Sequence, residues 1–160
     1  MTTSKIIPYA SDFSDEWYHM KGPIDIPLTN DYLFRALMQT NNEALISLIS
    51  SVMYWPVEEI ISAEIQNEIE LGAAIDDKTF ILDVKVLLNH DRIVNLEMQV
   101  LNYHNWPERS LGYLCRTFDT LNSGDDYIQT KPAFQITFLD FTLFPEHPVF
   151  HAKYMLTDIM

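Results

Sequence analysis

The chain has 160 residues, 48% of them hydrophobic, which is enough for one buried core and gives no sign of two. Its formal charge of -13 argues against a broad phosphate-binding surface, because such surfaces depend on a surplus of Lys and Arg. The acidic residues are concentrated between positions 58 and 83, whereas positions 85 to 131 are close to neutral. The lone cysteine, Cys115, excludes an internal disulfide and suits a reducing compartment.

Residues 1–28 are expected to form an N-terminal arm, because three prolines interrupt any regular element there. The arm has no apolar stretch typical of a signal peptide, and no run in the chain reaches the length of a transmembrane helix. We therefore expect a cytoplasmic protein with no membrane partner. Residues 29–160 should form one domain, whose apolar end favours a C-terminally truncated fragment.

Two helices are predicted after the arm. Thr29 or Asn30 offers an N-cap to a helix that runs to about Gln39, and a second helix is expected from Asn42 to about Met53. Residues 60–71 carry both helical and alternating patterns, and we favour a strand over part of them. Clearer strands are predicted at 79–88 and 93–101, joined by a short polar turn into a hairpin.

A third helix is expected from about Pro107 to Asn122, with His104 or Asn105 as its N-cap. Cys115 adjoins the apolar stripe of this helix and should be buried with it. The stripe, which should face the core, consists of Leu111, Leu114, Phe118 and Leu121. A strand is predicted at 134–141 and one more at 149–156. This order of elements predicts an α/β fold with a central mixed sheet flanked by helices.

Two of the predicted strands each carry a carboxylate within an apolar run: Asp83 among residues 81–86 and Glu97 among residues 94–100. An unpaired buried carboxylate is costly and normally finds a cation or becomes protonated. Two in consecutive strands therefore indicate a metal site. The alternatives are that Asp83 ends its strand paired with Lys85 or a nearby Arg, and that Glu97 occupies a solvent-facing edge position.

The length of the hairpin turn tests the metal interpretation. Side chains alternate between the two faces of a strand, so a two-residue turn would set Asp83 opposite Met98 and place the carboxylates on opposite faces. A three-residue turn from Asn89 to Asp91 would set Asp83 opposite Glu97. The metal interpretation therefore predicts an odd turn or a bulge.

The ordered motifs of the chain resemble the PD-(D/E)XK nuclease superfamily, and within it the transposase-associated, recombination-promoting (Rpn-like) branch. The resemblance extends over most of residues 28–145. The segments that carry it are LTNDYLF (28–34), ILDVK (81–85), NLEMQ (95–99), RSLGY (109–113), SGDDY (123–127), KP (131–132) and LDF (139–141).

This resemblance implies a restriction-endonuclease-like core in which Asp83 and Glu97 bind Mg²⁺, with Mn²⁺ as an alternative ion. The backbone carbonyl of Met98 would be a third ligand. Mg²⁺ prefers oxygen ligands and often takes only one or two protein carboxylates. Two positions depart from the superfamily pattern: Leu82 stands where a proline precedes the aspartate, and Gln99 stands where a lysine follows the glutamate. Gln99 can orient a water but carries no charge.

Two further groups of residues have a structural and a functional interpretation. Arg109, Tyr113 and Arg116 recur at helical spacing, so they either bind DNA phosphates or form a solvated helix face. The match of Arg109 and Tyr113 to the family favours phosphate contact. Asp31 lies in the first turn of its helix, where the helix dipole stabilises a carboxylate. The functional alternative is that Asp31 supports the metal site, as an acidic residue of an early helix can do in this superfamily.

The resemblance implies a metal-dependent DNA endonuclease domain of a transposase or recombination-promoting protein of a mobile element, which hydrolyses phosphodiester bonds. DNA would be its partner, and a homo-oligomer is left open. One alternative is a catalytically decayed nuclease-fold module that binds nucleic acid or protein, which the acidic surface and Gln99 favour. The other is an interaction domain with no nucleic-acid role.

Overall fold

The computed structural model describes residues 26–67, 83–119, 121 and 123–158. Most of the predicted arm and residues 79–82 of the first hairpin strand therefore lie outside the described residues. The elements are α1 (Asp31–Thr40), α2 (Asn42–Met53), the 3-10 helix η3 (Val57–Glu59), β1 (Ala63–Ile65), β2 (Val84–Leu88), β3 (Arg92–Gln99), α3 (Trp106–Phe118), the 3-10 helix η4 (Tyr127–Gln129) and β4 (Ala133–Leu139).

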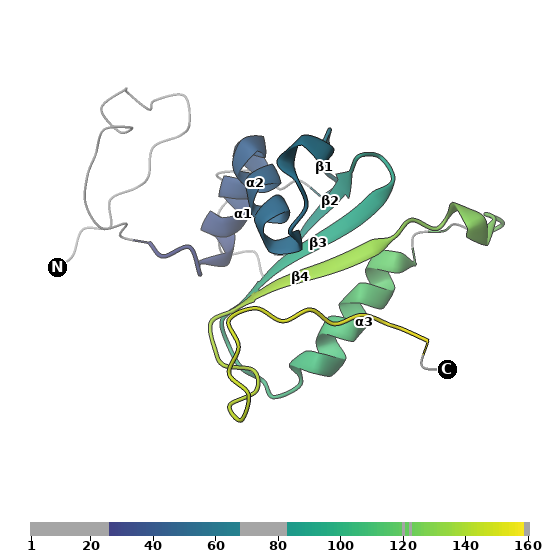
Figure 1. Ribbon diagram of the computed structural model, residues 1–160. Helices are drawn as coiled ribbons and strands as arrows, with labels where there is room; N and C mark the ends of the chain where they lie inside the picture. Colours follow the sequence, from purple (N-terminus) through teal and green to yellow (C-terminus); the bar gives the residue numbers. More distant parts are fainter. Residues whose placement is uncertain (1–25, 68–82, 120, 122, 159–160) are drawn as a thin grey trace, which may run out of the picture.

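The four strands form one mixed sheet in the order β1-β2-β3-β4. β1 pairs antiparallel with β2, and β2 pairs antiparallel with β3. β3 pairs in parallel with β4, and α3 makes the crossover between them. Helices α1 and α2 lie on one side of the sheet and α3 lies on the other (Figure 1). The predicted α/β fold with a mixed sheet is thereby confirmed.

The first two helices begin at asparagine caps; Asn30 is one of the two caps predicted for the first helix, and Asn41 was not predicted. The Asn30 side chain accepts a hydrogen bond of 2.9 Å from the backbone N–H of Leu33, and Asn41 accepts one of 2.9 Å from Ala44. Each cap satisfies a backbone donor that the first turn of a helix leaves without a partner. Because a single residue separates α1 from α2, both helices are held over the same face of the sheet.

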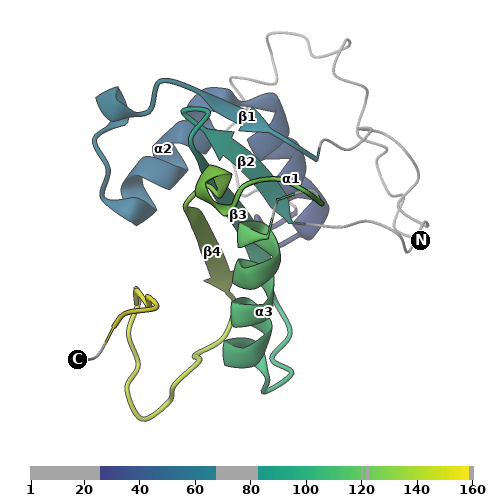
Figure 2. The same ribbon diagram turned by 90° about the vertical axis from the view of Figure 1, so that its right-hand side faces the viewer.

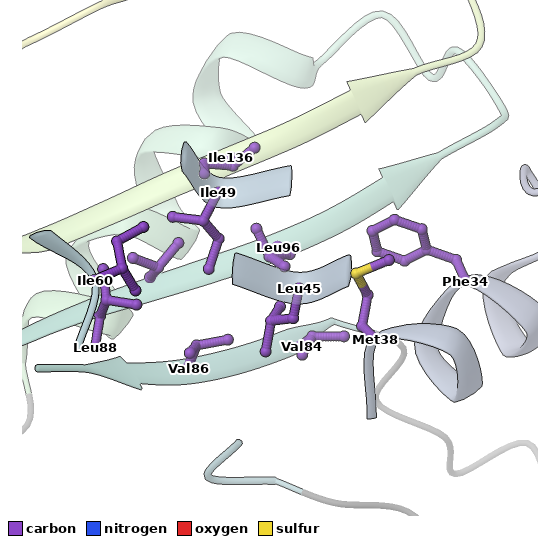
Figure 3. Packing of buried hydrophobic residues seen from close by; sticks show 11 residues of the cluster. Phe34, Met38, Leu45, Ile49, Ile60, Val84, Val86, Leu88, Leu96 and Ile136 are labelled. Carbon is purple, nitrogen blue, oxygen red and sulfur yellow. The ribbon is translucent and has the colours of Figure 1, made fainter. Parts of the chain in front are cut away.

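One face of the sheet carries the apolar core. In β2, β3 and β4 the residues of even number point to this face and pack against α1 and α2, as Figure 3 shows for β2 and β3. Phe34 and Met38 of α1 lie beside Val84 and Leu96, at the end of the sheet where β2 begins (Figure 3). The fully buried members of the core are Leu45, Ile49, Val84, Val86, Leu88, Val94 and Leu96.

The prediction for the inward face of α3 was wrong. Leu111 is 47% exposed and Phe118 is 52% exposed, whereas Trp106 and Thr117 are buried. Cys115, which we expected to be buried beside the stripe, is exposed. Both views place α3 beside β3 and β4, on the face opposite the core (Figure 2). That face of the sheet is polar, so the polar and aromatic side of α3 packs against it and the apolar side turns outward.

The strand predicted over part of residues 60–71 is confirmed as β1, which covers Ala63–Ile65. A second strand prediction needs correction. The strand expected at 149–156 is absent, since the described residues from Asp140 to Asp158 form bends and turns without a strand. Among the described helices, none has the length and apolar character needed to cross a membrane.

Candidate functional site

A three-residue turn joins the two strands that carry the carboxylates. Leu88 pairs with Arg92, so the turn consists of residues 89–91, as the metal interpretation predicted. Asn89 and His90 adopt positive φ angles of 51° and 60°. The Asn89 side chain stabilises this backbone by accepting from Ile61 N–H at 2.8 Å and donating to the Glu59 carbonyl at 2.7 Å.

This turn sets the register of the hairpin. The last pair of the ladder is Val84 with Leu96, and one further step places Asp83 opposite Glu97. In β2 and β3 the residues of odd number point away from the core, so Asp83 and Glu97 belong to the face opposite the core. The two carboxylates therefore lie on the same face of the hairpin, as a shared metal site requires.

Glu97 is buried in the middle of the sheet, with 6% of its surface exposed. Its Oε1 accepts a hydrogen bond and ion pair from Arg109 Nη2 at 3.2 Å, and its Oε2 accepts from Gln135 Nε2 at 3.4 Å. Burial raises the pKa of Glu97, the Arg109 charge opposes this, and the charges of Asp83 and Asp31 add to it. The alternative of a solvent-facing edge position is wrong.

Asp31 brings a third carboxylate toward this site. Its Oδ1 is buried and has no hydrogen-bond partner, and burial raises the pKa of this side chain. Asn30 provides the N-cap of α1, so Asp31 is not needed for that role. The charge of Asp31 acts on Glu97, which indicates that α1 presents its first turn to the same end of the sheet.

Two residues that the sequence analysis missed hold the backbone at Asp83. Arg35, which is 2% exposed, donates from Nη1 to the Asp83 carbonyl at 2.6 Å and from Nη2 to the Asn67 carbonyl. Asn67 Nδ2 donates to the same Asp83 carbonyl at 2.9 Å, and its Oδ1 accepts from Lys85 N–H at 2.8 Å. The available signal for this network was an arginine set between Phe34 and Ala36 in the apolar part of the predicted helix.

Gln99 and Met98 lie next to Glu97 on β3 but point to opposite faces. Gln99 is 8% exposed, and its Nε2 donates to the Leu101 carbonyl at 2.7 Å. Its side-chain carbonyl oxygen is the atom that can accept from a water. The Met98 side chain packs against the core, so only its backbone carbonyl can act as a ligand near Glu97.

Arg109 is the cation that reaches Glu97. Tyr113 Oη accepts a hydrogen bond from Arg109 Nη2 at 3.0 Å, and the guanidinium lies 5.2 Å from the Tyr113 ring centroid and 5.9 Å from that of Trp106. Arg109 Nε is buried without a hydrogen-bond partner. Arg116 is exposed to solvent two turns further along α3. The structure thus brings Arg109 into contact with the carboxylate and Tyr113 into contact with Arg109, whereas Arg116 lies away from both.

Amide side chains extend the polar face from β3 to β4. Asn95 and Gln135 are direct neighbours in the parallel ladder, and Asn95 Nδ2 donates to Gln135 Oε1 at 2.9 Å. The sequence analysis did not single out either residue. The signal was available, because Asn95, Glu97 and Gln99 alternate with apolar residues in one run, as Gln135 and Thr137 do in another.

The donor set fits a hard divalent cation. The charges of Asp83 and Asp31 act on Glu97, the buried Oδ1 of Asp31 lacks a partner, and Glu97 is largely desolvated. No three Asp, Glu, His or Cys side chains in the described parts of the chain are close enough to hold a metal ion by themselves. Mg²⁺ does not require three, because it retains several water ligands.

Residues 28–160 match the family described as PD-(D/E)XK nuclease family transposase, which is more than half of the chain. No match was found among curated proteins or among solved structures.

Proposed function

Because the chain belongs to the PD-(D/E)XK nuclease family transposases, we propose that it is a metal-dependent DNA endonuclease domain of a transposase or recombination-promoting protein, acting in the cytoplasm. The observation that carries this proposal is the three-residue turn, which sets Asp83 opposite the buried Glu97. A hairpin that served only to close the sheet would not need two carboxylates on the face away from the core.

Asp83 and Glu97 would hold Mg²⁺ or Mn²⁺, with the Met98 carbonyl as a backbone ligand. Such an ion would supply an activated water and positive charge for hydrolysis of a phosphodiester. The Arg35 and Asn67 network holds the backbone at Asp83, so the carboxylate needs no large rearrangement to bind. Burial of Glu97 strengthens its attraction for a cation, because the local dielectric constant is low.

The remaining polar residues would act on the water and on the DNA. The side-chain carbonyl oxygen of Gln99 can accept a hydrogen bond from a water, while its NH₂ group donates to the Leu101 carbonyl. Arg109, held against Tyr113 and partly exposed to solvent, has guanidinium N–H groups that can donate to a phosphate oxygen at the edge of the site. A positive charge at this point helps DNA approach a protein whose net charge is -13.

A second candidate is a decayed nuclease-fold module that binds nucleic acid or protein without cleaving DNA. It rests on Gln99, which stands where the superfamily has a lysine and is anchored to a backbone carbonyl. The two proposals differ in their requirement for a metal ion.

Cleavage of DNA tests the endonuclease proposal directly. The purified chain should nick or linearise supercoiled plasmid in the presence of Mg²⁺ or Mn²⁺ and should be inactive in EDTA. Gel electrophoresis resolves the three plasmid forms. Cleavage that persists in EDTA would contradict the proposal, and metal-independent DNA binding without cleavage would support the decayed module.

Mg²⁺ is expected to raise the melting temperature of the wild-type chain and not that of Asp83→Asn. An ion that binds only the native state stabilises it by mass action, by about 2.7 kcal/mol at an ion concentration of 100 times Kd. Calorimetry with and without the ion measures the shift. Glu58→Gln, at an exposed position of η3, is the control and should retain the wild-type shift. Equal shifts in wild type and Asp83→Asn would place the ion elsewhere.

Gln99→Ala should lower the cleavage rate by about 10- to 100-fold, less than the loss of either carboxylate, if Gln99 only positions a water. Single-turnover rates at saturating Mg²⁺ measure this change. The affinity for the ion should stay near that of the wild type, because the amide is not among the proposed ligands. A loss as large as that of Glu97→Gln would assign Gln99 a direct part in binding the ion or the transition state.

A further inference from the structure

Gln135 contacts the second oxygen of the buried glutamate. Its Nε2 donates to Glu97 Oε2 at 3.4 Å and to Thr137 Oγ1 at 3.3 Å. Its Oε1 accepts from Asn95 Nδ2 at 2.9 Å. These residues lie side by side on β3 and β4, where Asn95 pairs with Gln135 and Glu97 pairs with Thr137.

The bond from Asn95 determines which end of the Gln135 amide faces Glu97. Asn95 is 2% exposed, so its Nδ2 needs a partner within the protein, and the Gln135 oxygen supplies it. With that oxygen engaged, the Gln135 NH₂ group is turned toward the carboxylate. The amide pair therefore presents a donor, and not an acceptor, to Glu97 Oε2.

Gln135 and Arg109 hold the two oxygens of Glu97 in different ways. Arg109 brings a positive charge to Oε1, and this charge repels a divalent cation that binds Glu97. Gln135 brings a neutral donor to Oε2, so it can fix the direction of the carboxylate without repelling a cation. Hydrogen bonds of this kind to a metal ligand orient it and influence its affinity for the ion.

We propose that Gln135 is a positioning residue for Glu97, and that Asn95 anchors it. The inference rests on the proposed function, in which Glu97 is a metal ligand. Gln135 itself does not touch the ion; it holds Oε2 so that the remaining lone pairs of Glu97 are directed into the site.

Gln135→Leu should weaken binding of Mn²⁺ by about 10- to 100-fold, the usual effect of removing such an outer hydrogen bond. Isothermal titration calorimetry with Mn²⁺ alone measures this without reference to cleavage. Gln129→Leu, an exposed glutamine of η4, is the matched control and should bind Mn²⁺ like the wild type. Wild-type affinity in Gln135→Leu would overturn the proposal.

A second variant separates positioning from a general loss of structure. Gln135→Leu leaves the buried Asn95 amide without its partner, which should lower the melting temperature. The double variant Asn95→Leu/Gln135→Leu removes both members of the pair, so its melting temperature should recover toward that of the wild type. Its Mn²⁺ affinity should remain low. Recovery of both properties together would show a structural role alone and would overturn the proposal.

The contact with Glu97 can also be tested without any ion. In the ion-free protein, Glu97→Gln should shift the side-chain amide resonances of Gln135 in a ¹⁵N–¹H spectrum and leave those of Gln129 unchanged. An unchanged Gln135 signal would overturn the proposal whatever the ion does. If the wild type binds no Mn²⁺ but the Gln135 signal does shift, the metal centre has failed and the orienting contact stands.

Discussion

Replacing Asp83 with Asn, or Glu97 with Gln, should reduce metal-dependent DNA cleavage by about 10³-fold or more, because each change removes an anionic ligand of the proposed ion. Both substitutions keep the size of the side chain, so the fold should persist. Plasmid cleavage and single-turnover rates, measured at equal protein concentration, give the size of the loss. Glu58→Gln, at an exposed site, should cleave like the wild type.

The stability of these variants provides the control. Burial raises the pKa of Glu97, so the ion-free wild type should lose stability as pH rises through that pKa, where the buried carboxyl becomes charged. Glu97→Gln has no such charge and should be at least as stable as the wild type at neutral pH. An Asp83→Asn or Glu97→Gln protein that is folded and fully active would contradict the assignment of these residues. A variant that unfolds would show instead that the carboxylate is needed for the structure.

Arg109→Gln should have opposite effects on the two ligands of the site: DNA binding should weaken, and binding of a divalent ion should tighten, each by about tenfold. Arg109 neutralises Glu97 in the ion-free protein at a distance of 3.2 Å. Its removal leaves Glu97 more attractive to an ion and takes away the partly exposed guanidinium proposed to contact a phosphate. Calorimetry with Mn²⁺ and fluorescence anisotropy with a labelled duplex in Ca²⁺ measure the two affinities.

Arg116→Gln is the matched control, because it removes the same charge from an exposed position of the same helix. It should leave ion binding unchanged and alter DNA binding only through the net charge. Ion binding that weakens in Arg109→Gln would mean that Arg109 supports the ion site and does not compete with it. Equal losses of DNA binding in both variants would mean that Arg109 contributes only to the general charge.

Local patterns in the sequence were sufficient to predict the hairpin and its carboxylates. The two-residue period of β2 and β3 allows only odd turns if Asp83 and Glu97 are to share a face, and residues 89–91 form such a turn. Asparagine also tolerates the positive φ angle that this turn requires at residue 89. The caps at Asn30 and Asn41 are equally local, because each side chain reaches only three residues along the chain.

The partners of the carboxylates could not be predicted, since they come from distant parts of the chain. Arg35 precedes Asp83 by 48 positions, and Gln135 follows Glu97 by 38. Their contacts depend on which face of the sheet each helix covers and on the register between β3 and β4. No local pattern contains that information.

The sequence by itself determined the first two helices, the hairpin and the mixed α/β class, and it set the turn parity that a shared site would need, because these depend on neighbours and on periodicity. Only the tertiary structure decided the orientation of α3. Its apolar stripe predicted burial, yet Leu111 and Phe118 are largely exposed and the helix turns Trp106, Arg109 and Thr117 inward. The reason is the surface beneath it: the far face of β3 and β4 is lined with buried polar groups, and an uncompensated carboxylate such as Glu97 is costlier than an exposed leucine.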